Sequence, residues 1–157
     1  MDSSTGDDPE PGGGERAGGD LGAMVGHLLR RAQQLHAALW AEGVPGGITS
    51  PQYAVLHVLG DNPRISQGRV GELASLDRST VAELVGRLVE RGLIDRSRDP
   101  ADGRRNLLSL TAEGGELLRI TTPAVVEVNR SLLSPLDDLD SAQLRSLLSR
   151  LLDRDPH

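Results

Sequence analysis

The chain has 157 residues, of which 25% are charged and 37% apolar, and its formal net charge is −6. This is the composition of an ordinary folded protein, which excludes a chain that is fibrous or disordered throughout. The absence of cysteine excludes disulfides, thiolate nucleophiles and cysteine-based zinc sites. No apolar run is long enough for a transmembrane helix, and the acidic first residues lack the apolar segment of a secretory signal. We therefore expect a cytoplasmic protein.

The charge is unevenly distributed along the chain. Residues 1–20 carry six acids and one arginine, whereas residues 78–105 carry seven arginines and five acids. The middle of the chain is therefore its basic part, where a polyanion is expected to bind. Residues 1–19 combine Gly, Pro, Asp and Ser without an apolar period, which predicts a disordered tail.

Only one Trp, one Tyr and no Phe are present, so the core must be aliphatic. Leucine-rich segments with helical spacing then favour helices over a β-sandwich. The expected elements are helices at about 21–42, 51–59, 66–76 and 77–91, strands at 93–98 and 106–110, and helices capped by Thr111 and by Asp140 or Ser141, with Ile65 as a single strand residue. This order predicts a mainly α fold with one small β-hairpin.

Residues 66–92 give two short helices joined by a turn and followed at once by the hairpin. This is the order of a winged helix-turn-helix, whose second helix enters the major groove of DNA with its first residues at the base edges. Here that helix begins Arg78-Ser79-Thr80, and an arginine can fork onto guanine while hydroxyls contact phosphates or bases. The hairpin, or wing, adds arginines suited to the minor groove, namely Arg96, Arg98, Arg104 and Arg105. The alternative is a winged-helix module that contacts only proteins, with its arginines in solvent.

Three segments make this interpretation more specific. ITSPQYAVLHVL, VGELASLDRSTVAELVGRLVERGLIDR and DPADGRRNLLSLTAEG follow one another between Ile48 and Gly114. In order and spacing they resemble the multiple antibiotic resistance regulator (MarR) family of bacterial transcription factors. The resemblance implies an obligate homodimer in which the first, fifth and sixth helices interlock, with a ligand crevice between that region and the winged helix. It also implies that Arg104 enters the minor groove while Asp102 orients it. Glu83 stands where many members have a basic residue, which argues against a base contact there.

The apolar faces of the helices also indicate a dimer. The first helix and the two leucine-rich C-terminal helices offer more apolar surface than one small winged helix can cover. We expect residues 20–157 to form one domain, with 20–45 and 112–157 as the helical dimerisation region and 48–111 as the winged helix-turn-helix. The alternative is a helical bundle within one chain, for which the chain is short.

The first helix carries side chains suited to a small aromatic acid. Arg30 or Arg31 would bind the carboxylate, His36 a ring hydroxyl, and Trp40 the ring itself. The segment VGHLLRRAQQLHAALW resembles family members that sense phenolic carboxylates. The alternative is that the arginines form surface ion pairs and that Trp40 fills space. His57, in the second helix, is interpreted as a packing residue.

Other chemistry has no support in the sequence. It contains no Ser-His-Asp order, glycine-rich phosphate loop or His-x-x-x-His pair, so we expect no enzyme, no metal site and no cofactor. The prediction is a homodimeric repressor that binds pseudo-palindromic double-stranded DNA and is released by a small aromatic carboxylate. No membrane partner is expected.

Overall fold

The computed structural model describes residues 20–153, so the tail predicted for residues 1–19 lies outside the described residues. The chain divides into two compact units, with the boundary after Gln33. The first unit holds η1 (Leu21–Ala23), a 3-10 turn, and the beginning of α1 (Val25–Gly43). The helix expected from Leu21 begins only at Val25, because Met24 has an extended backbone conformation and separates the 3-10 turn from α1. None of the described helices is long and apolar enough to cross a membrane.

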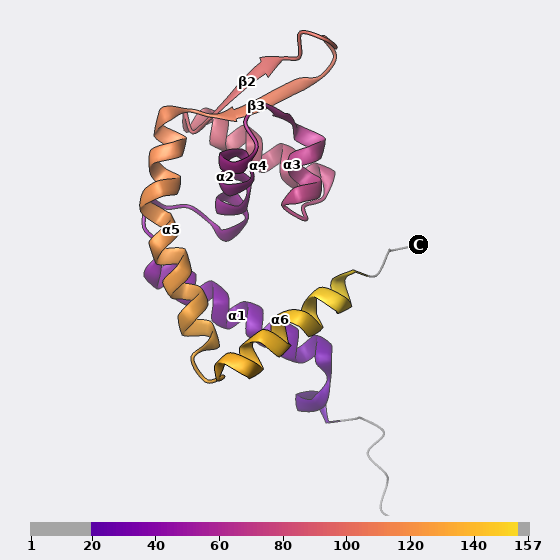
Figure 1. Ribbon diagram of the computed structural model, residues 1–157, viewed down its shortest axis with the longest axis vertical. Coiled ribbons are helices and arrows are strands. Elements are labelled where there is room, and N and C mark those ends of the chain that lie inside the picture. The colour runs from indigo at the N-terminus through magenta and orange to yellow at the C-terminus, as the bar shows by residue number, and fades with distance from the viewer. Residues whose placement is uncertain (1–19, 154–157) are drawn as a thin grey trace, which may run out of the picture. The chain divides into compact units, whose positions relative to one another are not determined.

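The second unit contains the end of α1 and all remaining elements (Figure 1). They are α2 (Ser50–Asp61), β1 (Ile65–Ser66), α3 (Gln67–Leu73), α4 (Arg78–Glu90), β2 (Ile94–Arg98), β3 (Asn106–Leu110), α5 (Ala112–Leu133) and α6 (Asp138–Leu152). The three short strands form an antiparallel sheet in the order β1-β3-β2. The predicted mainly α fold with a small β-wing is confirmed, and the single strand residue expected at 65 is a two-residue strand.

Short polar side chains fix the start of most helices. Thr49 and Gln52 form a reciprocal capping box at α2, and Thr111 caps α5 by accepting the Gly114 amide at 3.0 Å. Two further predicted boundaries are wrong. Helix α3 ends at Leu73 rather than at residue 76, because the chain turns there, with Ser75 in a left-handed conformation at φ 54°. Helix α6 begins at Asp138, because Asp137 caps it in place of the residues expected at 140 or 141.

The core of the winged helix is aliphatic, as the composition predicts. Its fully buried side chains come from α2, α3, α4 and the sheet, namely Val55, Leu56, Leu59, Val70, Val81, Val85, Leu88, Ile94 and Leu108. Helix α4 buries Val81, Val85 and Leu88 in this core, and Leu84 is half-buried beside them. This core fixes α3, α4 and the sheet relative to one another, so the exposed residues at the start of α4 and on the wing are held by a rigid base.

Two neighbouring glycines of α5 give a matched test of this packing. A Cβ on the buried Gly114 would lie 2.0 Å from the carbonyl oxygen of Leu93, whereas a Cβ on Gly115 meets nothing within 4 Å. We expect Gly114→Ala to lower the free energy of unfolding by at least about 1–3 kcal/mol, because backbone must move. Gly115→Ala should raise it by about 0.5–1 kcal/mol through helix propensity. Urea unfolding followed by circular dichroism at one protomer concentration measures both, and equal stabilities would contradict the packing.

Candidate nucleic-acid interface and aromatic cavity

The turn between α3 and α4 is tight and sets the angle of the two helices. A Cβ on Gly71 would lie 3.2 Å from the carbonyl oxygen of Leu76, so the chain approaches α3 closely at that point. The amide of Leu76 donates to the carbonyl of Gly71 at 2.8 Å, which closes the turn. Helix α4 then starts at the exposed Arg78, whose side chain is free to leave the protein surface.

Asp77 caps α4 and also engages both hydroxyls that the sequence assigned to DNA. Its carboxylate accepts the Thr80 amide at 2.9 Å, the Thr80 hydroxyl at 2.5 Å and the Ser79 hydroxyl at 2.7 Å. These hydrogen bonds, that from the Thr80 side chain above all, hold the pKa of Asp77 well below its usual range. Each hydroxyl has one proton, and Ser79 and Thr80 both donate theirs to Asp77. The two hydroxyls can therefore still accept a hydrogen bond from a base amino group. To donate a hydrogen bond to a phosphate, either hydroxyl must first break its hydrogen bond to Asp77.

The wing is ordered by its own polar groups. Arg96 and Arg98 stand opposite Leu108 and Asn106 in the β2-β3 register, so these cross-strand neighbours share one face of the hairpin. Arg98 donates from Nη1 to the carbonyl of Gly103 at 2.6 Å, which ties the strand to the tip. Among the described hydrogen bonds, the Arg96 guanidinium makes none within the wing, so it remains available to DNA.

The Asp-x-Arg motif organises the backbone of the tip. The Asp102 carboxylate accepts the Arg104 amide at 3.1 Å, and the Asp102 carbonyl accepts the Arg105 amide at 2.9 Å. Among the described residues, Asp102 and Arg104 form no ion pair. The Asp102 carboxylate thus holds the backbone of the turn that presents Arg104, and its orienting role toward the Arg104 guanidinium stays a prediction.

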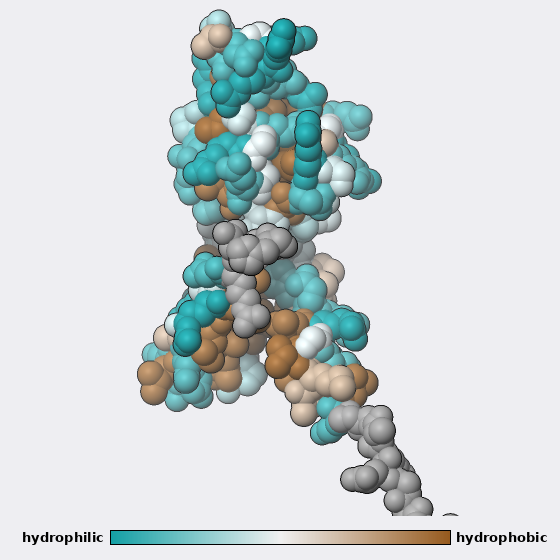
Figure 2. Space-filling view, turned by 90° about the vertical axis from the view of Figure 1, so that its right-hand side faces the viewer, coloured by the Kyte–Doolittle hydropathy of each residue, from teal (hydrophilic) through white to brown (hydrophobic). Residues whose placement is uncertain are grey.

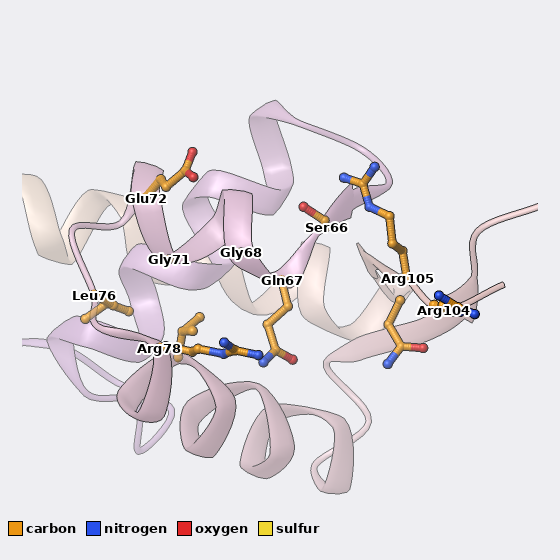
Figure 3. A pocket seen from close by; sticks show the side chains of 11 residues that line it. Ser66, Gln67, Gly68, Gly71, Glu72, Leu76, Arg78, Arg104 and Arg105 are labelled. Carbon is orange, nitrogen blue, oxygen red and sulfur yellow. The ribbon is translucent and has the colours of Figure 1, made fainter. Parts of the chain in front are cut away.

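A groove of about 710 Å³ separates the start of α4 from the wing. Figure 3 shows the Arg78 side chain extending toward Gln67, with Arg104 and Arg105 on the wing side. These three arginines form no ion pair with any residue that the structure describes, while the nearby Glu72 is neutralised by Arg69 at 2.8 Å. Glu83, which the sequence set aside as a base contact, pairs with Arg87 at 2.6 Å. The groove is thus lined by unpaired positive charge.

A second cavity, of about 440 Å³, lies among the end of α1, α2 and α5. Its lining comprises His36, Trp40, Ser50, Tyr53, Ala54, His57, Val125, Val126, Val128 and Asn129. Four of these residues form a continuous series of rings, with centroids 5.6 Å apart for His36 and Trp40, and 5.8 Å for the Trp40–Tyr53 and Tyr53–His57 pairs. Valines of α5 complete an apolar slot with a few polar groups, which is the usual make-up of a small-molecule site.

Some polar groups of this cavity already form hydrogen bonds within the protein. Trp40 is 8% exposed and donates its indole N–H to the carbonyl of Ile48 at 2.7 Å, so only its ring can contact a ligand. The Thr122 hydroxyl donates to the carbonyl of Leu118 at 2.7 Å, so the Tyr53 hydroxyl 3.1 Å away must be the donor to Thr122. Tyr53 is therefore left as an acceptor toward the cavity.

The structure brings together two of the four residues predicted to bind a ligand. His36 and Trp40 line the cavity, whereas Arg30 and Arg31 are exposed residues of the first unit, and their binding of a carboxylate stays a prediction. The interpretation of His57 as a packing residue is wrong, because its side chain is 56% exposed, stacks on Tyr53 and lines the cavity.

Sequence reasoning missed several residues of both sites. Gln67 and Asn106 line the groove, and Ser50, Tyr53 and Asn129 line the cavity. The i, i+4 spacing of Tyr53 and His57 places both on one helix face and could have indicated the second site. In the described part of the chain, no group of three or more His, Asp or Glu residues is arranged to hold a metal ion.

Comparison with known proteins places these features in a family. The MarR family model matches residues 46–105. The transcriptional regulator HosA of Escherichia coli is 35% identical over 127 residues, which cover 81% of this chain and 93% of HosA. The crystal structure of the PcaV transcriptional regulator from Streptomyces coelicolor, with its natural ligand, is 47% identical at a TM-score of 0.84 and covers 87% of this chain and 97% of that one. BpsR of Bordetella bronchiseptica, whose DNA binding is regulated by 6-hydroxynicotinic acid, is 33% identical at a TM-score of 0.83. The match covers 87% of this chain and 98% of the BpsR chain.

The helix pair α3–α4, the β2-β3 wing and the arginine-lined groove between them define a winged helix-turn-helix protein that binds DNA. The matches to the transcriptional regulators HosA and PcaV extend over most of this chain, well beyond the winged helix-turn-helix. The chain belongs to the MarR family of transcriptional regulators.

Proposed function

We propose that the protein is a cytoplasmic homodimeric repressor that binds pseudo-palindromic double-stranded DNA and is released by a small hydroxylated aromatic acid. The observation that carries the DNA-binding part is the placement of Arg78 and Arg104 on opposite sides of one groove. Helix α4 then enters the major groove with Arg78 at a base edge, and the wing tip places Arg104 in the minor groove. Arg96 and Arg105 add positive charge for the backbone, while Arg98 supports the tip.

Exposed leucines support the homodimer. On α6, Leu139 is 76% and Leu152 78% exposed, and Leu144, Leu147 and Leu151 are exposed on the same helix. In Figure 2, the wing at the top of the view carries mostly hydrophilic side chains, in contrast to these exposed leucines of α6. A second copy that covers α6 would remove this apolar surface from water. We assign residues 20–45 and 112–157 to the dimerisation region and residues 48–111 to DNA reading.

The aromatic cavity supports the effector. Its ring faces suit a flat aromatic ligand, and His36, Tyr53 and His57 can bind ring hydroxyls or a ring nitrogen. 6-Hydroxynicotinic acid, which regulates BpsR, has this chemistry. The prediction that Arg30 or Arg31 binds the carboxylate is tested with the effector itself.

The DNA-binding part of the proposal has a geometric test. A two-fold dimer should protect a pseudo-palindrome whose half-sites lie about 10 bp apart, one helical turn, because the protein axis must match that of the DNA. The measurement is footprinting on the duplex that the protein selects from a random-sequence library. Protection of a single unrepeated half-site would contradict the dimer. Failure to select any DNA would favour a module that contacts only proteins.

A further inference from the structure

A second basic hollow adjoins the DNA-reading groove. It has a volume of about 450 Å³, and its lining includes Arg64, Arg69 and Arg105. Ser66, Gly68, Glu72 and Arg105 line both this hollow and the groove between α4 and the wing. The two depressions therefore form one continuous path across the surface, with Arg105 at the point where they meet.

Two of its three arginines are electrostatically available. Arg69 is neutralised by Glu72 at 2.8 Å, whereas Arg64 and Arg105 form no ion pair with any residue that the structure describes. Figure 3 shows the Arg105 guanidinium on the side of Ser66, directed away from Arg104. The adjacent wing arginines therefore serve different parts of the surface: Arg104 borders the groove, and Arg105 turns toward the second hollow.

The backbone at Arg64 gives an independent indication of function. Its φ is 62°, in the left-handed region, which side chains other than Gly, Asn and Asp adopt at a cost. Such positions persist where the surrounding structure holds them, and they concentrate at functional sites. Here the strained residue is an exposed arginine immediately before the edge strand β1, at the border of the hollow.

We propose that the DNA backbone leaves the groove, passes over Arg105 and reaches Arg64, so that these two arginines bind phosphates outside the bases read by α4. This inference rests on the proposed DNA binding. Duplex DNA suits the surface better than a small anion does, because both arginines are exposed residues and the hollow continues the groove. Flanking phosphates would add affinity without sequence information.

Arg64 can be tested without disturbing the fold. Asn tolerates a positive φ better than Arg does, so Arg64→Asn removes the charge while it relieves strain. Arg64→Lys keeps the charge. Arg119→Gln is the control, because it also removes one exposed charge that is paired, with Glu116, far along the chain on α5. The probes are two duplexes built on the sequence that the wild type selects, one ending at the protected bases and one with an added helical turn on each side.

On the long duplex, Arg64→Asn should bind several-fold more weakly and lower the slope of log affinity against log salt by about 0.9 per protomer. On the short duplex, Arg64→Asn and the wild type should bind equally, and Arg64→Lys and Arg119→Gln should follow the wild type on both. Unchanged long-duplex binding by Arg64→Asn, or an equal loss on both duplexes, would overturn the flanking contact alone. A wild type that binds neither duplex would overturn the proposed function together with this inference.

Discussion

Arg78→Ala should weaken binding to the selected operator duplex by about 1–3 kcal/mol per half-site and relax the preference at one base pair. The reason is that Arg78 is the first residue of α4, is exposed, and has no ion-pair partner among the described residues. Its fork of donors is therefore free for the two acceptors of a guanine. Binding to random-sequence DNA should change much less. Gel shifts with the operator and with each single-base variant at that position measure both effects.

Arg104→Ala should have the opposite signature. Because the guanidinium would meet the minor groove and its phosphates, the variant should lose affinity for operator and random DNA alike. Its salt slope should be lower by about 0.9 for each phosphate that the variant no longer binds. The Arg119→Gln variant controls for a change in net charge. If Arg78→Ala and Arg104→Ala both bound the operator as the wild type does, the groove between α4 and the wing would not be the DNA-reading surface.

The sequence was sufficient wherever a feature depends on neighbouring residues. The starts of α2, α4 and α5 follow from the hydroxyl or carboxylate of Thr49, Asp77 and Thr111, each of which accepts a backbone amide three residues on. The wing follows from two short strands around a polar loop. The first turn of α6 shows the limit of this reasoning, since several acids can cap it and only the structure selects Asp137.

Features that depend on tertiary contacts were not predictable from local pattern. Arg98 and Arg105 look alike in the sequence, yet one binds the wing tip and the other borders the second hollow. The commitment of the Ser79 and Thr80 hydroxyls to Asp77 required side-chain geometry. His57 was misjudged because a helix position next to buried residues is usually a packing position. Here α5 leaves a cavity beside it.

Induction is the second large effect that we expect. 6-Hydroxynicotinic acid or a hydroxybenzoate should stabilise the wild-type dimer in thermal unfolding and lower its operator affinity in a gel shift. The ligand can do so only through a preference for a spacing of the two winged helices that does not fit successive major grooves. To convert a dimer that is almost entirely DNA-competent into one that is almost entirely released, the ligand must bind the released conformation about 10⁴-fold more tightly, or by about 5.5 kcal/mol. A tenfold loss of operator affinity requires a difference of only about 1.4 kcal/mol.

The variants separate the parts of the ligand site. Loss of the carboxylate's partner, tested as Arg30→Ala and Arg31→Ala, should abolish induction while operator binding without ligand stays near wild type. His36→Ala should change the selectivity among ring hydroxylation patterns. Tyr53→Phe should reduce the advantage of hydroxylated acids over benzoate, because the Tyr53 oxygen accepts from a ligand hydroxyl and a site built for that hydrogen bond penalises analogues that lack it. If no aromatic acid stabilises the wild type at millimolar concentration, the effector site is wrong. The DNA-binding assignment would stand, because Arg78 and Arg104 belong to a different surface.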